Sequence, residues 1–149
     1  MIKRDAEISL SHLAKQFKSV AVIGPRQSGK TTLVKAVFPK KPYVNLENPD
    51  LRKFVTEDTR GFLSGYPNGA ILDEAQRVPE LFSYLQQVLD DSGKTGQFIL
   101  TGSNNFLLQE NIAQSLAGRI GLLTLLPFSM SEVGIKKTTS INELLFKGL

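Results

Sequence analysis

The sequence contains no cysteine and a single histidine, His12. The absence of cysteine excludes disulfides, zinc–thiolate sites and thiol nucleophiles, and it leaves carboxylates and hydroxyls as the reactive side chains. His12 has no second histidine, cysteine or aspartate at metal-ligand or triad spacing, so we interpret it as a residue on the surface of a helix. Any chemistry of this chain is therefore expected to rest on oxygen-bearing groups.

Long apolar runs are also lacking. No stretch is long enough to span a membrane, and residues 1–7 are polar, without the apolar core of a signal peptide. With 149 residues, of which 41% are hydrophobic, the chain is large enough to bury one core. These features predict a soluble globular domain in the cytoplasm, with no membrane partner.

Basic residues exceed acidic ones, which gives a formal net charge of +4. No run of Lys and Arg is interleaved with aromatic residues, and the nearest candidates are the pairs at 40–41 and 136–137. Such pairs are typical of ordinary solvated surface, and part of the excess serves to hold an anionic ligand. The charge is therefore weak support for a nucleic-acid partner.

Residues 24–31 read Gly-Pro-Arg-Gln-Ser-Gly-Lys-Thr and fill the phosphate-binding pattern Gly-x-x-x-x-Gly-Lys-Ser/Thr. An apolar run at 19–23 precedes them, and an apolar helical pattern at 32–38 follows. An accidental glycine-rich turn would have no reason to lie between a buried strand and a helix. The context therefore predicts a P-loop that binds a nucleoside triphosphate.

Each position of the loop has a distinct expected role. Gly24 and Gly29 allow positive φ and leave no Cβ beside the phosphate oxygens, and backbone N–H groups at a helix N-terminus hold anions. Lys30 is expected to reach the β- and γ-phosphates, and the Thr31 hydroxyl to bind Mg²⁺. For the side chains of Arg26 and Gln27 two alternatives stay open: they contact the nucleotide or a partner, or they are exposed to solvent. The expected nucleotide-binding set is Gly24, Pro25, Arg26, Gln27, Ser28, Gly29, Lys30, Thr31 and Thr32.

A second chemical signal stands at the end of the apolar strand predicted at 70–74, whose last two residues are Asp73 and Glu74. Two carboxylates beside a triphosphate are costly without a metal ion, which favours a site over a simple surface turn. Asp73 is expected to hold Mg²⁺ through water together with Thr31. Glu74 is expected to orient or deprotonate the water that attacks the γ-phosphate.

Strand-like and helical runs alternate along the chain, which predicts parallel strands with right-handed crossovers in a three-layer α/β sandwich. Ligands of such sheets lie beyond the carboxyl ends of the strands, so the loop and the acidic pair should meet Ser103 or Asn104 there. Ser103 is expected to bond the same water or the γ-phosphate, although Thr101 and Asn104 are open alternatives. The five predicted strands lie at 19–23, 43–47, 70–74, 97–100 and 120–126.

Three further segments have local predictions. Residues 5–17 have a helical pattern in which Ile8, Leu13 and Phe17 form the apolar stripe, and residues 61–69 are predicted as loops and turns. Residues 129–132 match a capping box that makes Glu132 structural, and a last apolar segment follows at 141–146.

Five segments of the chain form one ordered set. They are Gly-Pro-Arg-Gln-Ser-Gly-Lys-Thr-Thr-Leu at 24–33, Leu-Asp-Glu-Ala-Gln at 72–76, Phe-Ile-Leu-Thr-Gly-Ser at 98–103, Ser-Leu-Ala-Gly-Arg at 115–119 and Pro-Phe-Ser at 127–129. Together they resemble the prokaryotic AAA-type ATPases usually described only as ATP-binding proteins. In that family a winged-helix and nuclease-like region follows the P-loop domain. The resemblance therefore implies an ATPase core at 1–134 and the start of a truncated C-terminal region at 135–149.

The resemblance also implies roles for single residues. It assigns the Walker A and Walker B roles to the loop and to the acidic pair, and the sensor role to Ser103 or a neighbour. Arg119 is either an arginine finger that completes a neighbouring subunit's site, which implies a homo-oligomer, or a cation at a helix C-terminus. Asn45 resembles the polar residue that restrains the Walker B glutamate in some AAA proteins.

Three functions remain open at this point. The first is an ATPase that uses Mg²⁺, with ATP as the nucleotide because of the resemblance. The second is a module or switch in which nucleotide occupancy controls contact with a protein or DNA partner. A small-molecule kinase ranks lowest, because no lid with an arginine pair is visible.

Overall fold

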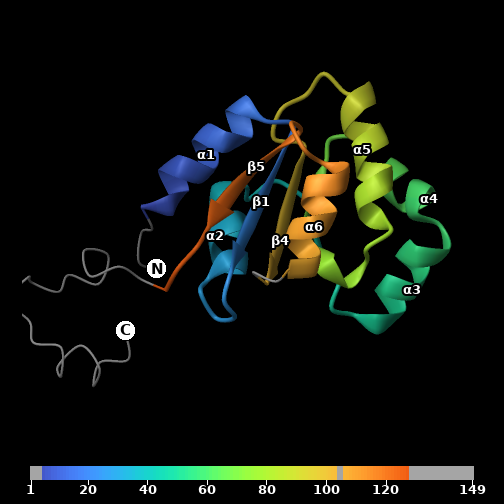
Figure 1. The fold of residues 1–149 in the computed structure, drawn as a ribbon, viewed down its shortest axis with the longest axis horizontal. Coiled ribbons are helices and arrows are strands. Elements are labelled where there is room, and N and C mark those ends of the chain that lie inside the picture. Colours follow the sequence, from blue (N-terminus) through green and yellow to red (C-terminus); the bar gives the residue numbers. More distant parts are fainter. Residues whose placement is uncertain (1–4, 104–105, 128–149) are drawn as a thin grey trace, which may run out of the picture.

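Five parallel strands form a single sheet in the order β2-β3-β4-β1-β5 (Figure 1). The structure is a computed structural model that describes residues 5–103 and 106–127. The parallel five-stranded α/β fold predicted from the alternation of elements is confirmed. The strands are β1 (Ser19–Gly24), β2 (Tyr43–Asn45), β3 (Ala70–Asp73), β4 (Phe98–Ser103) and β5 (Ile120–Thr124).

Helices cover both faces of the sheet (Figure 1). The helices α1 and α2 pack on one face, and α3 to α6 pack on the other. Their bounds are α1 (Ala6–Gln16), α2 (Lys30–Val37), α3 (Pro49–Glu57), α4 (Thr59–Ser64), α5 (Leu81–Asp91) and α6 (Phe106–Ser115), and the short 3-10 helix η1 (Ala75–Arg77) follows β3.

Strand β1, which lies between β4 and β5, is buried along its whole length, and the sheet divides the core in two. The side chains of β1 alternate, because successive residues of a strand point to opposite faces. Val20 and Val22 belong to the cluster under α1 and α2, whereas Ala21 and Ile23 belong to the cluster under the other helices. This continuous apolar run ends at Gly24, where the predicted phosphate-binding loop begins.

The apolar stripe predicted for α1 is wrong in part. Ile8 is 64% exposed, whereas Leu10 and Ala14 are buried against the sheet and Leu13 packs partly against them. Residues at spacings of three and four share one face of a helix, so Leu10, Leu13 and Ala14 form the buried stripe. His12 is exposed, in line with the prediction.

The prediction of loops and turns at 61–69 is wrong for residues 61–64, which belong to α4, and is confirmed for residues 65–69, which lie outside helices and strands. The side chain of Asp58 caps this helix by accepting a hydrogen bond from the N–H of Gly61 at 3.0 Å. Phe62 and Leu63 are buried and attach the helix to the core. Capping and burial together outweigh the low helix propensity of one glycine.

The predicted features at Asn104, at residues 129–132 and at residues 141–146 lie outside the described residues. Strand β4 extends further than predicted, through Ser103, because its last residues pair with the end of β1. Among residues 5–103 and 106–127, no helix has the length and apolar character needed to cross a membrane.

We expect Asp58→Ala to lower the free energy of unfolding by about 1 kcal/mol, the usual cost of losing a helix cap. The control is Asp58→Asn, which retains a side-chain oxygen as acceptor and should cost much less. Urea unfolding followed by far-UV circular dichroism measures both. Equal losses in the two variants would contradict the capping role.

Candidate functional site: a phosphate-binding loop beside a buried carboxylate

The loop at 24–31 connects the carboxyl end of β1 to the first turn of α2. Gly29 has φ 90°, a left-handed conformation that glycine adopts without steric cost. Next to the loop is a cavity of about 310 Å³. The residues lining it are Arg26, Gln27, Gly29, Lys30, Thr31, Thr32, Glu47 and Glu74, so six of the nine residues predicted to bind nucleotide contribute to one cavity.

Lys30 is the buried cation of this cavity and is only 7% exposed, whereas Arg26 at the same cavity is exposed. Its ammonium group donates to the backbone oxygens of Gly24 at 3.0 Å and Pro25 at 2.8 Å. Burial lowers the pKa of Lys30, and the carboxylates of Glu74 and Asp73 act in the opposite direction. The loop thus positions one ammonium group, with two acids close enough to favour its charge.

Asp73 is the carboxylate on which the site converges, and it is 5% exposed. The hydroxyl of Thr31, in the first turn of α2, donates to its Oδ2 at 2.9 Å. The phenol of Tyr43 in β2 donates to the same oxygen, and the hydroxyl of Thr101 in β4 donates to Oδ1. One buried carboxylate therefore accepts hydrogen bonds from a helix and from two strands.

Tyr43 is a site residue that the sequence interpretation missed. Tyr43 pairs with Ile71 of β3, whereas Asn45, two residues later, pairs with Asp73. The long side chain of Tyr43 spans this offset and reaches the carboxylate of Asp73. Burial and the contact with Asp73 raise the pKa of Tyr43, which keeps the phenol protonated as a donor. The ammonium of Lys35 lies 3.8 Å from its ring centroid. An aromatic residue early in a short strand gave no local signal of this contact.

The chain turns away from the direction of β3 at Glu74, the residue after Asp73, because its backbone is left-handed with φ 60° and ψ 46°. Its N–H donates to the hydroxyl of Thr101 at 3.2 Å, and its carboxylate accepts a hydrogen bond from the side-chain amide of Gln76. Glu74 lines the cavity that also contains Lys30. The structure therefore brings the two predicted Walker elements to one edge of the sheet.

The other residues suggested for the carboxyl edge have different surroundings. Ser103 ends β4 and is paired in register with Gly24, so it lies beside the start of the loop. Of the candidates on β4, Thr101 is the one that contacts Asp73. The side-chain oxygen of Asn45 accepts from the N–H of Glu47 at 3.0 Å, and Glu74 is instead bonded by Gln76.

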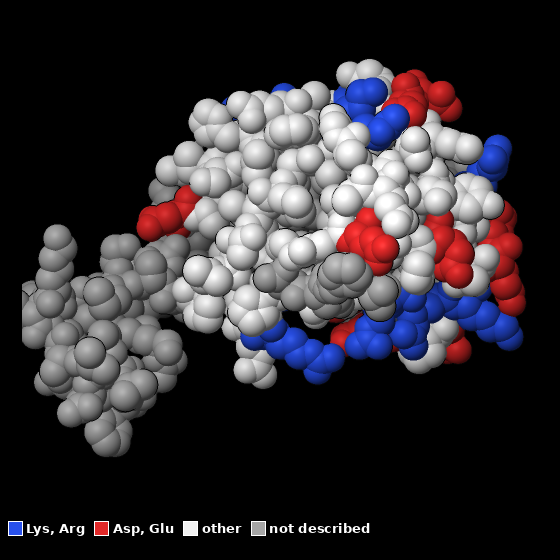
Figure 2. All heavy atoms as spheres, in the orientation of Figure 1, with Lys and Arg blue, Asp and Glu red and all other residues white. Residues whose placement is uncertain are grey.

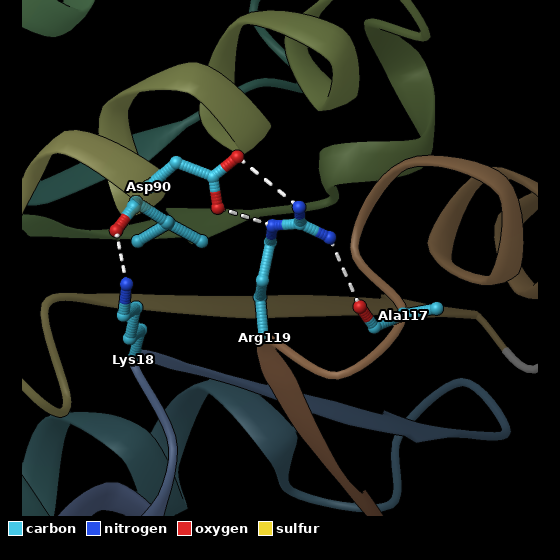
Figure 3. Close-up of polar contacts among 5 residues, drawn as sticks. Lys18, Asp90, Ala117 and Arg119 are labelled. Atoms are coloured by element: carbon cyan, nitrogen blue, oxygen red, sulfur yellow. Dashed lines mark hydrogen bonds and ion pairs between the residues drawn. The ribbon is translucent and has the colours of Figure 1, made fainter.

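Arg119 lies at the opposite edge of the sheet, because it precedes the residue of β5 that pairs with Ser19 at the beginning of β1. Its guanidinium donates to both oxygens of Asp90, at 2.5 and 3.1 Å, and to the backbone oxygen of Ala117 at 3.0 Å (Figure 3). Lys18 donates to the backbone of Leu89 nearby. Arg119 therefore joins α5 to the amino-terminal edge of the sheet and is remote from the cavity of its own chain.

The oxygens around Asp73 fit a magnesium ion. Mg²⁺ prefers hard oxygen ligands and is usually bound by one or two carboxylates and hydroxyls, together with water and phosphate. The hydroxyl oxygen of Thr31 and Oδ2 of Asp73 are 2.9 Å apart, and Thr31 lines the cavity beside the loop. These two residues would hold the ion.

A glycine loop between a buried strand and a helix, with its lysine and threonine beside an acidic strand end, defines a P-loop nucleoside-triphosphatase fold. The model of the AAA domain family matches residues 16–134, and the chain belongs to that family. It is an AAA-type P-loop ATPase core.

The chain is similar to two curated mycobacterial proteins, the uncharacterised proteins Mb2031c of Mycobacterium bovis and Rv2008c of Mycobacterium tuberculosis. Each is 35% identical over 135 residues, which cover 89% of this chain and 30% of the relative. The chain thus spans less than a third of the length of these relatives. Its fold is similar to that of the Walker-type ATPase PABY2304 of Pyrococcus abyssi, with a TM-score of 0.61 and 18% identity over 99% of this chain and 63% of that one.

The ion pair at the amino-terminal edge predicts a dependence on pH. Hydrogen bonds from Arg119 hold the pKa of Asp90 below its ordinary value. A carboxyl whose pKa is lower in the folded state adds stability above its unfolded pKa, and this contribution is lost as the pH falls through the folded pKa. We expect Arg119→Gln to raise the pKa of Asp90 in an NMR titration of the side-chain carboxyl carbon.

The difference in the free energy of unfolding between the wild type and Arg119→Gln should therefore become smaller at acidic pH, where Asp90 is protonated. Arg60→Gln, which removes an exposed arginine from α4, is the control and should leave the titration of Asp90 unchanged. An unaltered pKa in Arg119→Gln would contradict the contact in Figure 3.

Proposed function

We propose that this chain binds ATP together with Mg²⁺ and hydrolyses it to ADP and phosphate in the cavity beside the loop at 24–31. The observation that carries the proposal is the shared location of three groups. The hydroxyl of Thr31 contacts Asp73, and Glu74 lines the same cavity as Lys30. A cation, a metal-binding pair and a second carboxylate are the parts that phosphoryl transfer to water requires.

The roles follow from the positions of the side chains. Lys30 has three N–H donors, of which the backbone oxygens of Gly24 and Pro25 take two, and it would bind the β- and γ-phosphates with its charge. Thr31 and Asp73 would hold Mg²⁺, which when bound neutralises charge on those phosphates. The backbone of the loop would hold the remaining phosphate oxygens.

Glu74 would orient the attacking water and accept its proton. Its carboxylate lies one residue beyond Asp73 and faces the cavity, where the γ-phosphate would be bound by Lys30. Ser103, beside Gly24, would bond the same water or the γ-phosphate. The choice of ATP as the nucleotide rests on membership of the AAA family.

The second candidate is nucleotide binding as a switch with little turnover. The observation that favours it is the position of Arg119, which is bonded to Asp90 and lies far from the cavity of its own chain. An arginine finger at this position would have to leave that ion pair and act on a neighbouring subunit. Turnover per subunit that rises with protein concentration would support the finger and a homo-oligomer, whereas flat, near-zero turnover would favour the switch.

We further propose a cytoplasmic location and an ATPase core at 1–134 that continues into a further region from 135.

Charged side chains of both signs are interspersed on the face shown in Figure 2, mainly over the side where α3 and α4 lie. Because neither sign of charge dominates this face, it does not distinguish a nucleic-acid partner from a protein partner.

Glu74→Gln tests the assignment most simply. We expect the variant to bind ATP with wild-type affinity but to lose turnover by a factor on the order of 10²–10⁴, the contribution typical of a general base. Release of phosphate and binding of a fluorescent ATP analogue measure the two quantities.

The matched control is Glu47→Gln, which removes the other carboxylate lining the same cavity. It should affect turnover far less, since Glu47 lies on the loop after β2 and is paired with Arg77 at 3.8 Å. Unchanged turnover in Glu74→Gln would show that the base has been assigned to the wrong residue.

A further inference from the structure

The backbone of Glu74 is held in an uncommon conformation. Only Gln27 and Glu74 have positive φ among the non-glycine residues of the described chain, and such a conformation is strained for a residue with a Cβ. Two contacts fix it, since the N–H of Glu74 donates to Thr101 and its backbone oxygen accepts from the N–H of Arg77 at 3.0 Å. The direction in which the Glu74 side chain leaves the backbone is therefore set by its neighbours.

The end of that side chain is fixed by Gln76, whose amide N–H donates to Oε2 of Glu74. The amide oxygen of Gln76 is buried and has no hydrogen-bond partner among the residues that the structure describes. A buried acceptor without a partner is unfavourable. The amide keeps this orientation because its nitrogen, and not its oxygen, must face a carboxylate.

Strand β4 leaves room for this amide at Gly102. A Cβ at Gly102 would lie 2.5 Å from the amide oxygen of Gln76 and 2.6 Å from Cδ2 of Leu108. Both distances are too short for real contacts, so a larger residue would displace the side chains of Gln76 and Leu108. The pairing of Gln76 with Glu74 therefore depends on a glycine that is distant in the sequence.

We propose that Gln76 is the positioning residue of Glu74, holding its carboxylate toward the cavity so that the other oxygen, Oε1, is directed at the attacking water. The proposal rests on the role of Glu74 in hydrolysis proposed above. An amide suits this task, because it donates a hydrogen bond to the carboxylate but cannot take the proton that Glu74 must accept. Gln76 therefore acts on the reaction through Glu74 alone.

The test replaces Gln76 by methionine, which has a similar length and no polar group. We expect kcat to fall about 10- to 100-fold, the range typical of residues that hold and orient a reacting side chain without touching the substrate. The affinity for ATP should stay unchanged. The unfolding midpoint should stay the same or rise, because the substitution removes a buried oxygen without a partner. A merely structural role predicts a lower midpoint instead.

Two comparisons make the result specific. In a Glu74→Gln background, Gln76→Met should cause no further loss of kcat, because its effect passes through the missing carboxylate. Gln76→Glu places a second carboxylate beside the first and should lower kcat at least as much as Gln76→Met, which covers the case in which the methionine variant does not fold. Gln87→Met, an exposed position on α5, is the control and should match the wild type.

The outcomes separate this proposal from the proposed function. If Glu74→Gln abolishes turnover but the Gln76 variants retain it, the positioning role is wrong and the role of Glu74 stands. The positioning role is equally wrong if Gln76→Met lowers the affinity for ATP by the same factor as kcat, or if it lowers the unfolding midpoint. If neither Glu74→Gln nor Gln76→Met changes turnover, the positioning role of Gln76 and the assignment of Glu74 as the base are both wrong, whereas hydrolysis of ATP by this chain stands. Absence of turnover in the wild type would overturn the proposed function.

Discussion

The carboxylate of Asp73 is the group on which the arrangement of the site depends. A buried charge is unfavourable unless hydrogen bonds or an opposite charge compensate it, and here three hydroxyls do so, from Thr31, Tyr43 and Thr101. These hydroxyls belong to α2, β2 and β4. All three hydrogen bonds to the carboxylate therefore form only when that helix and those two strands are correctly placed beside β3. The same contacts place Thr31, the second residue of the helix after the loop, beside an acid.

The strand order explains how residues distant in the sequence meet. Strand β4 lies between β1 and β3, so it borders both the loop and the acidic pair. Thr101 accordingly bridges the two acids, by donating to Asp73 and accepting from the N–H of Glu74. Gly102 and Ser103 follow on the same strand, one beside Gln76 and the other beside Gly24. Much of the site is therefore built on the strand that carries neither Walker motif.

The sequence was sufficient to predict those parts of the site that have local patterns. The loop at 24–31 and the acids at the end of β3 each have a signature within a few residues, and the alternation of elements predicts the parallel sheet. Tyr43 has no such signature, and the segment at 72–76 that contains Gln76 gives no indication of its contact with Glu74, because the two contacts depend on register and on a turn at positive φ. The helix α4 was missed because its cap and its buried face outweigh Gly61, which cannot be judged without the tertiary packing.

The central claim is that Thr31 and Asp73 form a magnesium site for a nucleotide held by the loop. Calorimetric titration of ATP with and without Mg²⁺, on the wild type and on Asp73→Asn, tests it most directly, with thermal unfolding to verify that the variant is folded. We predict that Mg²⁺ strengthens ATP binding to the wild type and that Asp73→Asn loses this increment while it still binds ATP without the ion. An increment of the same size in Asp73→Asn would contradict the assignment of the magnesium site.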